Sequence, residues 1–391
     1  MLLSRVLVAL AVGLCVYTFL GYPAILMLVS RLGRGRRKTP PRSTVPRISI
    51  VLPVYNEARV IAATLERILA VDYPADRRQI LIVSDASTDG TDEIVAHFAD
   101  RGVELLRLPR RQGKTAAENA ARRHLTGEII VNTDASVRIH PAAVKRLVSV
   151  FADASVGVAS ARDVSVTNLE EQATSGEGAY VGYDMWIRDL ETAVGGIVGA
   201  SGCLYAIRAE LHMDHVPEGL SRDFAAALTA REHGLRAVSV PEAKCYVPRS
   251  ASLRQEYRRK VRTMTRGLAT LGHKRALLNP FRYGAFAWML FSHKVCRWLV
   301  PWALLSLLAA LGALAPTATW AFALLALLGV TVVLAGIAWV SPEGRLTPRL
   351  LALPGYVVAG NVAVLHAWLR VVAGRPAPVW EPTRRGPVPS S

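Results

Sequence analysis

The stretch Ile48-Ser-Ile-Val-Leu-Pro-Val-Tyr-Asn-Glu57 decides the fold. In it, a continuous apolar run ends in a polar loop that carries a carboxylate. The same pattern returns in Ile80–Asp89 and in Glu128–Asp134. Strands that are buried on both faces of a parallel sheet have such continuous apolar runs. The loops at their carboxyl ends form the ligand crevice of open α/β sheets. We therefore predict an α/β domain with a mostly parallel sheet and an acidic crevice.

Helical and extended patterns alternate around these runs. Helical spacing of apolar residues recurs at 58–70, 91–99 and 114–124, and a further strand is predicted at 103–108. This alternation indicates βαβ units. Beyond residue 161 the alternation weakens. We expect that part to complete the crevice, with helices at 169–190 and 223–233 and strands at 204–207 and 237–240.

The net charge of +17 is concentrated in two bands. Residues 31–47 carry seven basic and no acidic side chains, and residues 249–275 carry nine basic and one acidic. Residues 48–248, in contrast, have a net charge of −6, from 21 basic and 27 acidic side chains. A nucleic-acid-binding domain would have a basic face, whereas Lys and Arg beside apolar segments mark the cytoplasmic ends of membrane helices. We therefore predict an integral protein of the inner or plasma membrane with a cytoplasmic sheet domain and no nucleic-acid partner.

Apolar segments long enough to cross a hydrocarbon core of about 30 Å lie at both ends of the chain. Residues 2–30 are longer than the apolar part of a signal peptide. Residues 299–314 and 320–340 are uncharged, and residues 350–372 are a weaker candidate that Pro354 interrupts. A basic amphipathic helix at 253–271 is typical of a membrane surface.

These patterns divide the chain into six parts. The sheet domain is predicted at 48–248, and the other parts are an N-terminal membrane helix at 1–30, a basic and Pro-rich linker at 31–47, interfacial helices at 249–297, membrane helices at 298–373 and a tail at 374–391. The side of the membrane that holds the tail stays open. Three spans would place the tail outside, whereas its arginines favour the cytoplasm.

Carboxylates at the predicted strand ends have both structural and chemical interpretations. Asp89 and Asp92 are typical of turns and helix caps. Asp85 could form an Asx turn. Asp223 could open a helix, because Asp is frequent there, or it could serve as a general base. The spacing of Asp223 after Gly199–Arg208 favours its role as a base, whereas both interpretations of Asp85 stay open.

In its motifs the sequence resembles glycosyltransferase family 2. The resemblance covers essentially the whole chain and implies the GT-A fold, a Rossmann-like fold of inverting sugar transferases, in a membrane-bound form that serves polysaccharide synthesis. It rests on Pro53–Glu57, Ser84–Thr91, Gly113-Lys114, Asn119, Thr133–Ala135, Gly199–Arg208, Ser221–Asp223, Gln255–Lys260 and Trp380-Glu-Pro-Thr-Arg384.

The resemblance implies a role for each matching residue on the donor side. Asp85 would read the nucleotide base, and Asp134 would hold a divalent metal, Mg²⁺ or Mn²⁺, on the diphosphate. Carboxylate oxygens suit these hard cations. Ser136 stands where the family's metal motif has a second acid, so metal binding would depend chiefly on Asp134. The residues that would bind the nucleotide sugar are Pro53, Tyr55, Glu57, Asp85, Lys114 and Asp134.

The resemblance also implies an acceptor side. Asp223 would be the catalytic base that takes a proton from the acceptor hydroxyl. Arg259 stands where processive members carry a Trp, which argues against a polymerase. The residues expected beside the acceptor or the diphosphate are Gly202, Cys203, Arg222, Gln255, Arg258 and Arg259.

The sequence thus predicts a membrane-embedded inverting glycosyltransferase. It would move a sugar from a nucleotide sugar, expected to be a UDP-sugar, to a lipid-linked or polysaccharide acceptor. Its partners would include membrane lipids and a polysaccharide export apparatus. Two alternatives stay open: sugar transfer to a polyprenyl phosphate, and a non-catalytic membrane subunit that binds nucleotide sugar. No GxGxxG follows a predicted strand, which argues against a dinucleotide oxidoreductase.

Overall fold

The computed structural model describes residues 1–32, 45–168, 171–172, 176–248, 252–341 and 349–375. Most of the basic linker predicted at 31–47 lies outside the described residues. The same is true of residues 249–251 and of the tail from residue 376, which contains the Trp380 motif.

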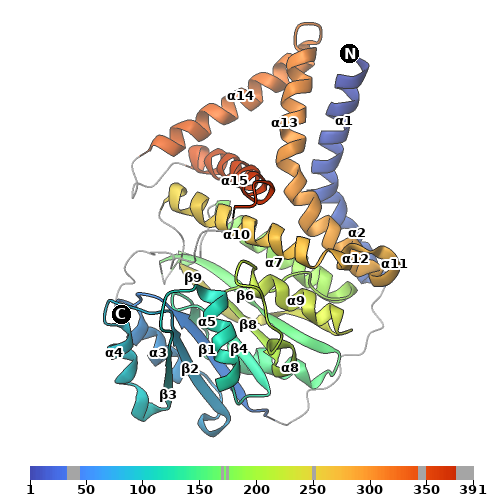
Figure 1. Cartoon of the computed structure of the whole chain (residues 1–391). Coiled ribbons are helices and arrows are strands. Elements are labelled where there is room, and N and C mark those ends of the chain that lie inside the picture. The colour runs from blue at the N-terminus through green and yellow to red at the C-terminus, as the bar shows by residue number, and fades with distance from the viewer. Residues whose placement is uncertain (33–44, 169–170, 173–175, 249–251, 342–348, 376–391) are drawn as a thin grey trace.

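A single mixed sheet forms the centre of the domain below the long helices in Figure 1. Its strand order is β3-β2-β1-β4-β8-β6-β9-β5, and β7 pairs with β6. The pairs β1–β2, β2–β3, β1–β4 and β6–β9 are parallel, which confirms the predicted α/β class. The strands are β1 (Ile48–Val54), β2 (Arg78–Ser84), β3 (Val103–Arg107), β4 (Ile129–Thr133), β5 (Arg138–Ile139), β6 (Val156–Asn168), β7 (Glu171–Gln172), β8 (Leu204–Arg208) and β9 (Arg236–Pro248).

Helices cover both faces of this sheet and so bury the central strands completely. Alternate residues of β1 illustrate the two faces, because successive side chains of a strand point to opposite sides. Ile50 and Leu52 pack with α3 and α6, and Val51 packs with α5 and α9. The covering helices are α3 (Ile61–Leu69), α4 (Thr91–Ala96), α5 (Lys114–Ala121), α6 (Ala143–Ser149), α7 (Gly176–Val194), α8 (Ala209–His212) and α9 (Arg222–Glu232).

Two longer elements of the sheet domain, and the short elements β5, β7 and α8, were not predicted from the sequence. Strand β6 and helix α6 were not predicted, and the strand predicted at 237–240 continues to Pro248 as β9. The second half of β6 carries polar residues such as Arg162 and Asp163, because this part of the strand is only partly buried. Such a strand lacks the continuous apolar run that identifies β1, β2 and β4.

Four helical segments of the described chain are long and apolar enough to cross a membrane: Leu2–Leu32, Ala285–Leu314, Thr319–Val340 and Leu351–Val372. The second segment includes residues 285–297, which were predicted as interfacial helices. Here α12 (Ala285–Leu290), a π-helix (Phe291–Cys296) and α13 (Arg297–Leu314) follow one another without a break. Figure 1 shows α13 beside α1 (Leu2–Val16), well above the sheet.

The last apolar segment is also a single helix, α15 (Arg349–Val372), which continues through Pro354. The residue after this proline is Gly355, which lies at a close contact between two helices. A Cβ on Gly355 would lie 2.9 Å from the Cβ of Ala338 in α14 (Thr319–Val340). Gly355 therefore allows α15 to pack closely on α14.

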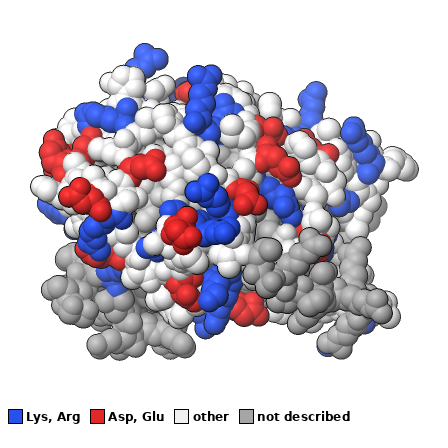
Figure 2. Space-filling model, turned by 90° about the horizontal axis from the view of Figure 1, so that it is seen from below, with Lys and Arg blue, Asp and Glu red and all other residues white. Residues whose placement is uncertain are grey.

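The basic amphipathic helix α10 (Leu253–His273) lies between the sheet domain and α15 (Figure 1). The ammonium of Lys260 lies 3.5 Å from the ring centre of Tyr356 in α15. Tyr257 contacts Trp339 edge to face, with ring centres 5.5 Å apart. Cation–π and aromatic pairs therefore hold the membrane helices on this basic helix. On the opposite face of the protein, basic and acidic side chains are interspersed (Figure 2).

Gly127 provides a test of the close packing between the segment before β4 and the start of β1. A Cβ at this position would lie 2.4 Å from the backbone nitrogen of Ser49 and 2.5 Å from the carbonyl carbon of Ile48. Because backbone atoms cannot rotate away, we expect Gly127→Ala to lower the free energy of unfolding by about 3 kcal/mol.

Thermal unfolding of the detergent-purified protein measures this effect. The control is Gly272→Ala near the end of α10, where a Cβ meets no atom within 4 Å. There the change should stay within about 1 kcal/mol. Equal stability of the two variants would contradict the packing described for Gly127.

Candidate active site

The ends of β1, β2 and β4 meet at one edge of the sheet, as their parallel pairing requires. The loop after β1 and the loop after β2 are bonded to each other. The backbone N–H of Thr88 donates to the side-chain oxygen of Asn56 at 2.8 Å. Asp89 accepts hydrogen bonds from the N–H groups of Ala58 and Thr91, at 3.0 and 3.1 Å. Asp89 is therefore a turn residue, as predicted, while Gly90 is the N-cap of α4.

Asp85 is fully buried at the end of β2. Its two carboxylate oxygens accept the N–H groups of Gln112 and Gly113, each at 2.7 Å. Asp85 thereby fixes the loop that opens α5 and presents Lys114. Its predicted role toward the nucleotide base stays a prediction.

The other residues predicted to bind the donor lie at the rim or inside the sheet. Tyr55 is half-buried, with the guanidinium carbon of Arg111 3.9 Å from its ring centre. The backbone N–H of Glu57 donates to Thr91 at 2.9 Å. Pro53 is a buried residue within β1, opposite Val83 of β2, so its position supports the strand.

Lys114 and Asp134 form the centre of the site. The Lys114 ammonium lies 2.5 Å from an Asp134 carboxylate oxygen and 3.4 Å from the carbonyl oxygen of Gly202. Burial alone would lower the pKa of Lys114, but Asp134 and Glu118 raise it above its ordinary value. Lys114 is therefore charged at neutral pH.

Asp223 joins this centre from the first turn of α9. The Ser221 hydroxyl lies 2.5 Å from one Asp223 carboxylate oxygen. A Cβ on Gly202 would lie 2.8 Å from the other oxygen. Only a glycine at position 202 lets the carboxylate approach the loop so closely. The structure thus brings together Lys114, Asp134, Gly202 and Asp223, which come from four separate segments of the sequence.

Of the other residues predicted for the acceptor side, Cys203 directly follows Gly202, and the rest lie elsewhere. Arg222 points into the protein, where it donates to Asn119 at 2.5 Å and to the carbonyl oxygen of His212 at 2.7 Å. Arg259 pairs with Glu256 on its own helix at 2.7 Å. The exposed Arg258 and the half-buried Gln255 are in the first two turns of α10, and Cys203 is half-buried in the loop before β8.

Two charged residues beside this centre, Arg266 and Glu118, were not predicted from the sequence. Burial lowers the pKa of Arg266 in α10, while the negative charges of Asp223 and Glu118 act to raise it. Glu118 is 1% exposed, and neither of its oxygens has a hydrogen-bond partner among the described residues. Its nearest cations, Lys114 and Arg222, are both 4.0 Å away. The available signal was the four-residue spacing from Lys114, which places Glu118 on the same face of α5.

Glu118 should give the stability of the protein a specific pH dependence. Burial raises the pKa of Glu118, although Lys114 and Arg222 oppose the shift. The ionised form is thus disfavoured in the folded protein, and we expect Glu118→Gln to unfold at an equal or higher temperature at neutral pH. The difference should vanish as pH falls below 4.5, the ordinary pKa, because the carboxyl group is then protonated in both states.

Thermal unfolding at a series of pH values measures this dependence. The control is Glu210→Gln, which changes an exposed glutamate of α8 and should leave the pH dependence as it is. If Glu118→Gln unfolded at a clearly lower temperature at neutral pH, the attraction of Lys114 and Arg222 would outweigh the effect of burial.

Comparison with known proteins places these observations in a family. Residues 49–210 match the model of glycosyl transferase family 2. The beta-monoglucosyldiacylglycerol synthase of Nostoc sp. is 29% identical over 185 residues, 46% of this chain and 39% of that protein. The undecaprenyl-phosphate 4-deoxy-4-formamido-L-arabinose transferase of Edwardsiella ictaluri is 33% identical over 109 residues, 27% of this chain and 34% of that protein. The matches thus span about two fifths or less of these relatives.

A solved structure extends the similarity over the whole chain. The mannosyltransferase PcManGT from Pyrobaculum calidifontis, in complex with GDP-Man and Mn²⁺, is 25% identical, with a TM-score of 0.71. The similarity covers 94% of this chain and 99% of that one. The predicted enzyme class and fold are thereby confirmed. The sheet domain, over residues 49–210, therefore belongs to glycosyltransferase family 2 and has the GT-A fold.

Proposed function

We propose that the protein transfers a sugar from a nucleotide sugar to a lipid-borne acceptor at a membrane surface, with inversion of the anomeric carbon. The observation that carries this proposal is the meeting of Lys114, Asp134 and Asp223 around Gly202. A cation and two carboxylates in one half-buried place can bind a diphosphate and accept a proton.

The proposed reaction is a single displacement. The acceptor oxygen bonds to the anomeric carbon while the bond from that carbon to the diphosphate oxygen breaks. Asp223 takes the proton of the acceptor hydroxyl, and the Lys114 ammonium offsets charge on the departing nucleotide diphosphate. Attack from the face opposite the leaving group inverts the carbon.

Asp134 is the proposed ligand of a divalent metal. The described residues contain no group of three or more His, Cys, Asp and Glu side chains that could hold a metal ion. Mg²⁺ is often bound by one or two carboxylates together with the phosphates of a substrate. Asp134 and the donor diphosphate would form such a set, and the metal would neutralise charge on the phosphates.

The surroundings of Asp223 favour a lipid-borne acceptor. Arg266, which interacts with Asp223, belongs to α10, and α10 lies directly beneath the apolar helix α15 (Figure 1). The relative in Nostoc sp. is named for a diacylglycerol product. In our proposal the sheet domain lies on the cytoplasmic side, where nucleotide sugars would reach the edge formed by β1, β2 and β4. Synthesis of a surface polysaccharide or glycolipid fits this arrangement.

A polyprenyl phosphate is the second candidate acceptor, because the relative in Edwardsiella ictaluri is named for undecaprenyl phosphate. An ionised phosphate needs no general base, so Asp223 discriminates between the two acceptor classes. A hydroxyl acceptor requires its carboxylate, and a phosphate acceptor does not.

We expect Asp223→Asn to lower kcat for transfer to a hydroxyl acceptor by about 10²–10⁴-fold, the usual contribution of a general base. Transfer from radiolabelled nucleotide sugars to extracted lipids, with purified protein in vesicles, measures the rate. Asp214→Asn, at an exposed loop position, is the matched control and should retain full activity. An unimpaired Asp223→Asn with a hydroxyl acceptor would exclude the proposed base. Unimpaired activity confined to polyprenyl phosphate would favour the second acceptor.

We also expect chelation of divalent metals to abolish transfer and added Mn²⁺ or Mg²⁺ to restore it. Asp134→Ala should raise the metal concentration needed for half-maximal activity at least about tenfold, because it removes the one protein carboxylate proposed as a ligand. Titration of transfer rate against metal concentration measures this. Full activity after chelation, or an unchanged metal requirement in Asp134→Ala, would overturn the assignment.

A further inference from the structure

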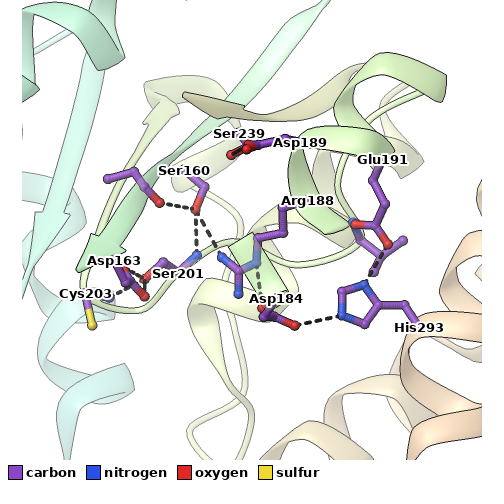
Figure 3. A network of polar contacts seen from close by, with 12 residues as sticks. Ser160, Asp163, Asp184, Arg188, Asp189, Glu191, Ser201, Cys203, Ser239 and His293 are labelled. Carbon is purple, nitrogen blue, oxygen red and sulfur yellow. Dashed lines mark hydrogen bonds and ion pairs between the residues drawn. The ribbon is translucent and has the colours of Figure 1, made fainter. Parts of the chain in front are cut away.

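A buried polar network joins α7 to the first and second apolar segments (Figure 3). Asp184 of α7 accepts Nε of Arg188 at 3.1 Å and Nη1 of Arg297 at 2.9 Å, and its oxygen lies 3.2 Å from Nε2 of His293. The other ring nitrogen of His293 lies 2.6 Å from Glu191 of α7. His293 and Arg297 belong to the apolar segment Ala285–Leu314.

The first apolar segment reaches the same carboxylate. Tyr22 of α2 (Tyr22–Leu32) donates its hydroxyl to Glu191 at 2.5 Å, and both residues are completely buried. Charges buried in this way are costly unless they are paired. The network therefore fixes how α7 sits against the helices that lead to the membrane.

The other end of the network holds a loop of the active site. Arg188 Nη1 lies 3.4 Å from the hydroxyl of Ser160 in β6, and the same hydroxyl accepts the backbone N–H of Ser201 at 2.8 Å. The Ser201 hydroxyl donates to Asp163, with oxygens 2.6 and 2.7 Å away. It also accepts the backbone N–H of Cys203 at 3.1 Å. The backbone on both sides of Gly202 is thus bonded to side chains that Arg188 organises.

Arg188 is charged and central to this arrangement. Burial alone would lower its pKa, but Asp184 and Asp163 raise it. Asp223 acts on Arg188 in the same direction. Replacing buried ion pairs by apolar residues is often neutral or stabilising, so such a network is weak evidence for stability alone. A role in the geometry of the neighbouring loop accounts for it better.

We propose that Arg188 is a positioning residue for sugar transfer, which holds the loop Gly199–Cys203 at a place set by the membrane helices. The loop in turn keeps Gly202 against Asp223 and its carbonyl oxygen on Lys114. The catalytic part of this inference rests on the proposed roles of Asp223 and Lys114. A displacement of about 1 Å at a reacting group can cost roughly 10²-fold in rate.

Arg188→Lys tests the proposal, because lysine keeps the charge but cannot bond to Asp184 and Ser160 through two separate nitrogens. Ser160→Ala is the second variant. It removes only the hydroxyl between Arg188 and Ser201 and leaves every charge in place. The matched control is Arg162→Lys. Arg162 also joins β6 to α7, through Asp189 at 3.3 Å, but it is about one third exposed and has no described contact with the loop.

Two readouts separate positioning from a loss of folding. The first is sugar transfer, for which both test variants should lose at least about 10-fold in kcat, with little change in the KM of the nucleotide sugar. The second is the alkylation rate of Cys203, measured by peptide mass spectrometry with the buried Cys245 as internal reference. Both test variants should expose Cys203 and raise its rate several-fold, while Arg162→Lys matches the wild type in both readouts.

The thiol readout needs no catalysis, so it distinguishes this proposal from the proposed function. Unchanged Cys203 reactivity and unchanged kcat in Ser160→Ala would overturn the positioning role, whatever Arg188→Lys does to stability. Faster alkylation of Cys203 without any loss of kcat would show that the network holds the loop but that the loop does not position the reaction. Failure of the proposed function would instead appear as unimpaired transfer by Asp223→Asn.

Discussion

The ion pair of Lys114 and Asp134 is the interaction on which the rest of the site depends. Lys114 is largely enclosed, and an enclosed ammonium group must be surrounded by oxygen atoms. The oxygens come from the end of β4, from the loop before β8 and from Glu118 on the next turn of α5. The parallel pairing of β1 with β4, and the antiparallel pairing of β4 with β8, bring these segments together. The order of the strands therefore decides which side chains meet in the site.

The parts that the sequence predicted are those whose structure depends on local pattern. Strands β1, β2 and β4 were evident because burial on both faces requires continuous apolar runs. Asp89 was recognised as a turn residue because its partner, Thr91, is two positions away. In contrast, β6 has a polar second half, and the inward direction of Arg222 follows from Asn119, more than a hundred residues earlier. Partners that distant leave no periodic signal in a single sequence.

Contacts between distant residues also limited what could be predicted for α10 and the apolar segments. Their hydropathy identified four candidate spans, but not which turns belong to lipid and which to protein. Tyr22 is completely buried against the sheet domain although it lies in an apolar segment. Arg297 lies within another such segment because Asp184 of α7 neutralises it. A charge inside an apolar helix here indicates a contact with the catalytic domain rather than the end of the helix.

Gly202 lies between the charged side chains of the active site and the polar network that leads to the apolar helices. On one side its carbonyl oxygen faces Lys114, and on the other its missing side chain leaves room for Asp223. The residues before and after it are bonded to β6, and through Arg188 to the helices of the membrane. A membrane anchor could be joined to an enzyme by a flexible linker alone. In this protein the buried charges of α7 connect the anchor to the loop between Lys114 and Asp223, so the geometry of the site depends on how the membrane helices pack.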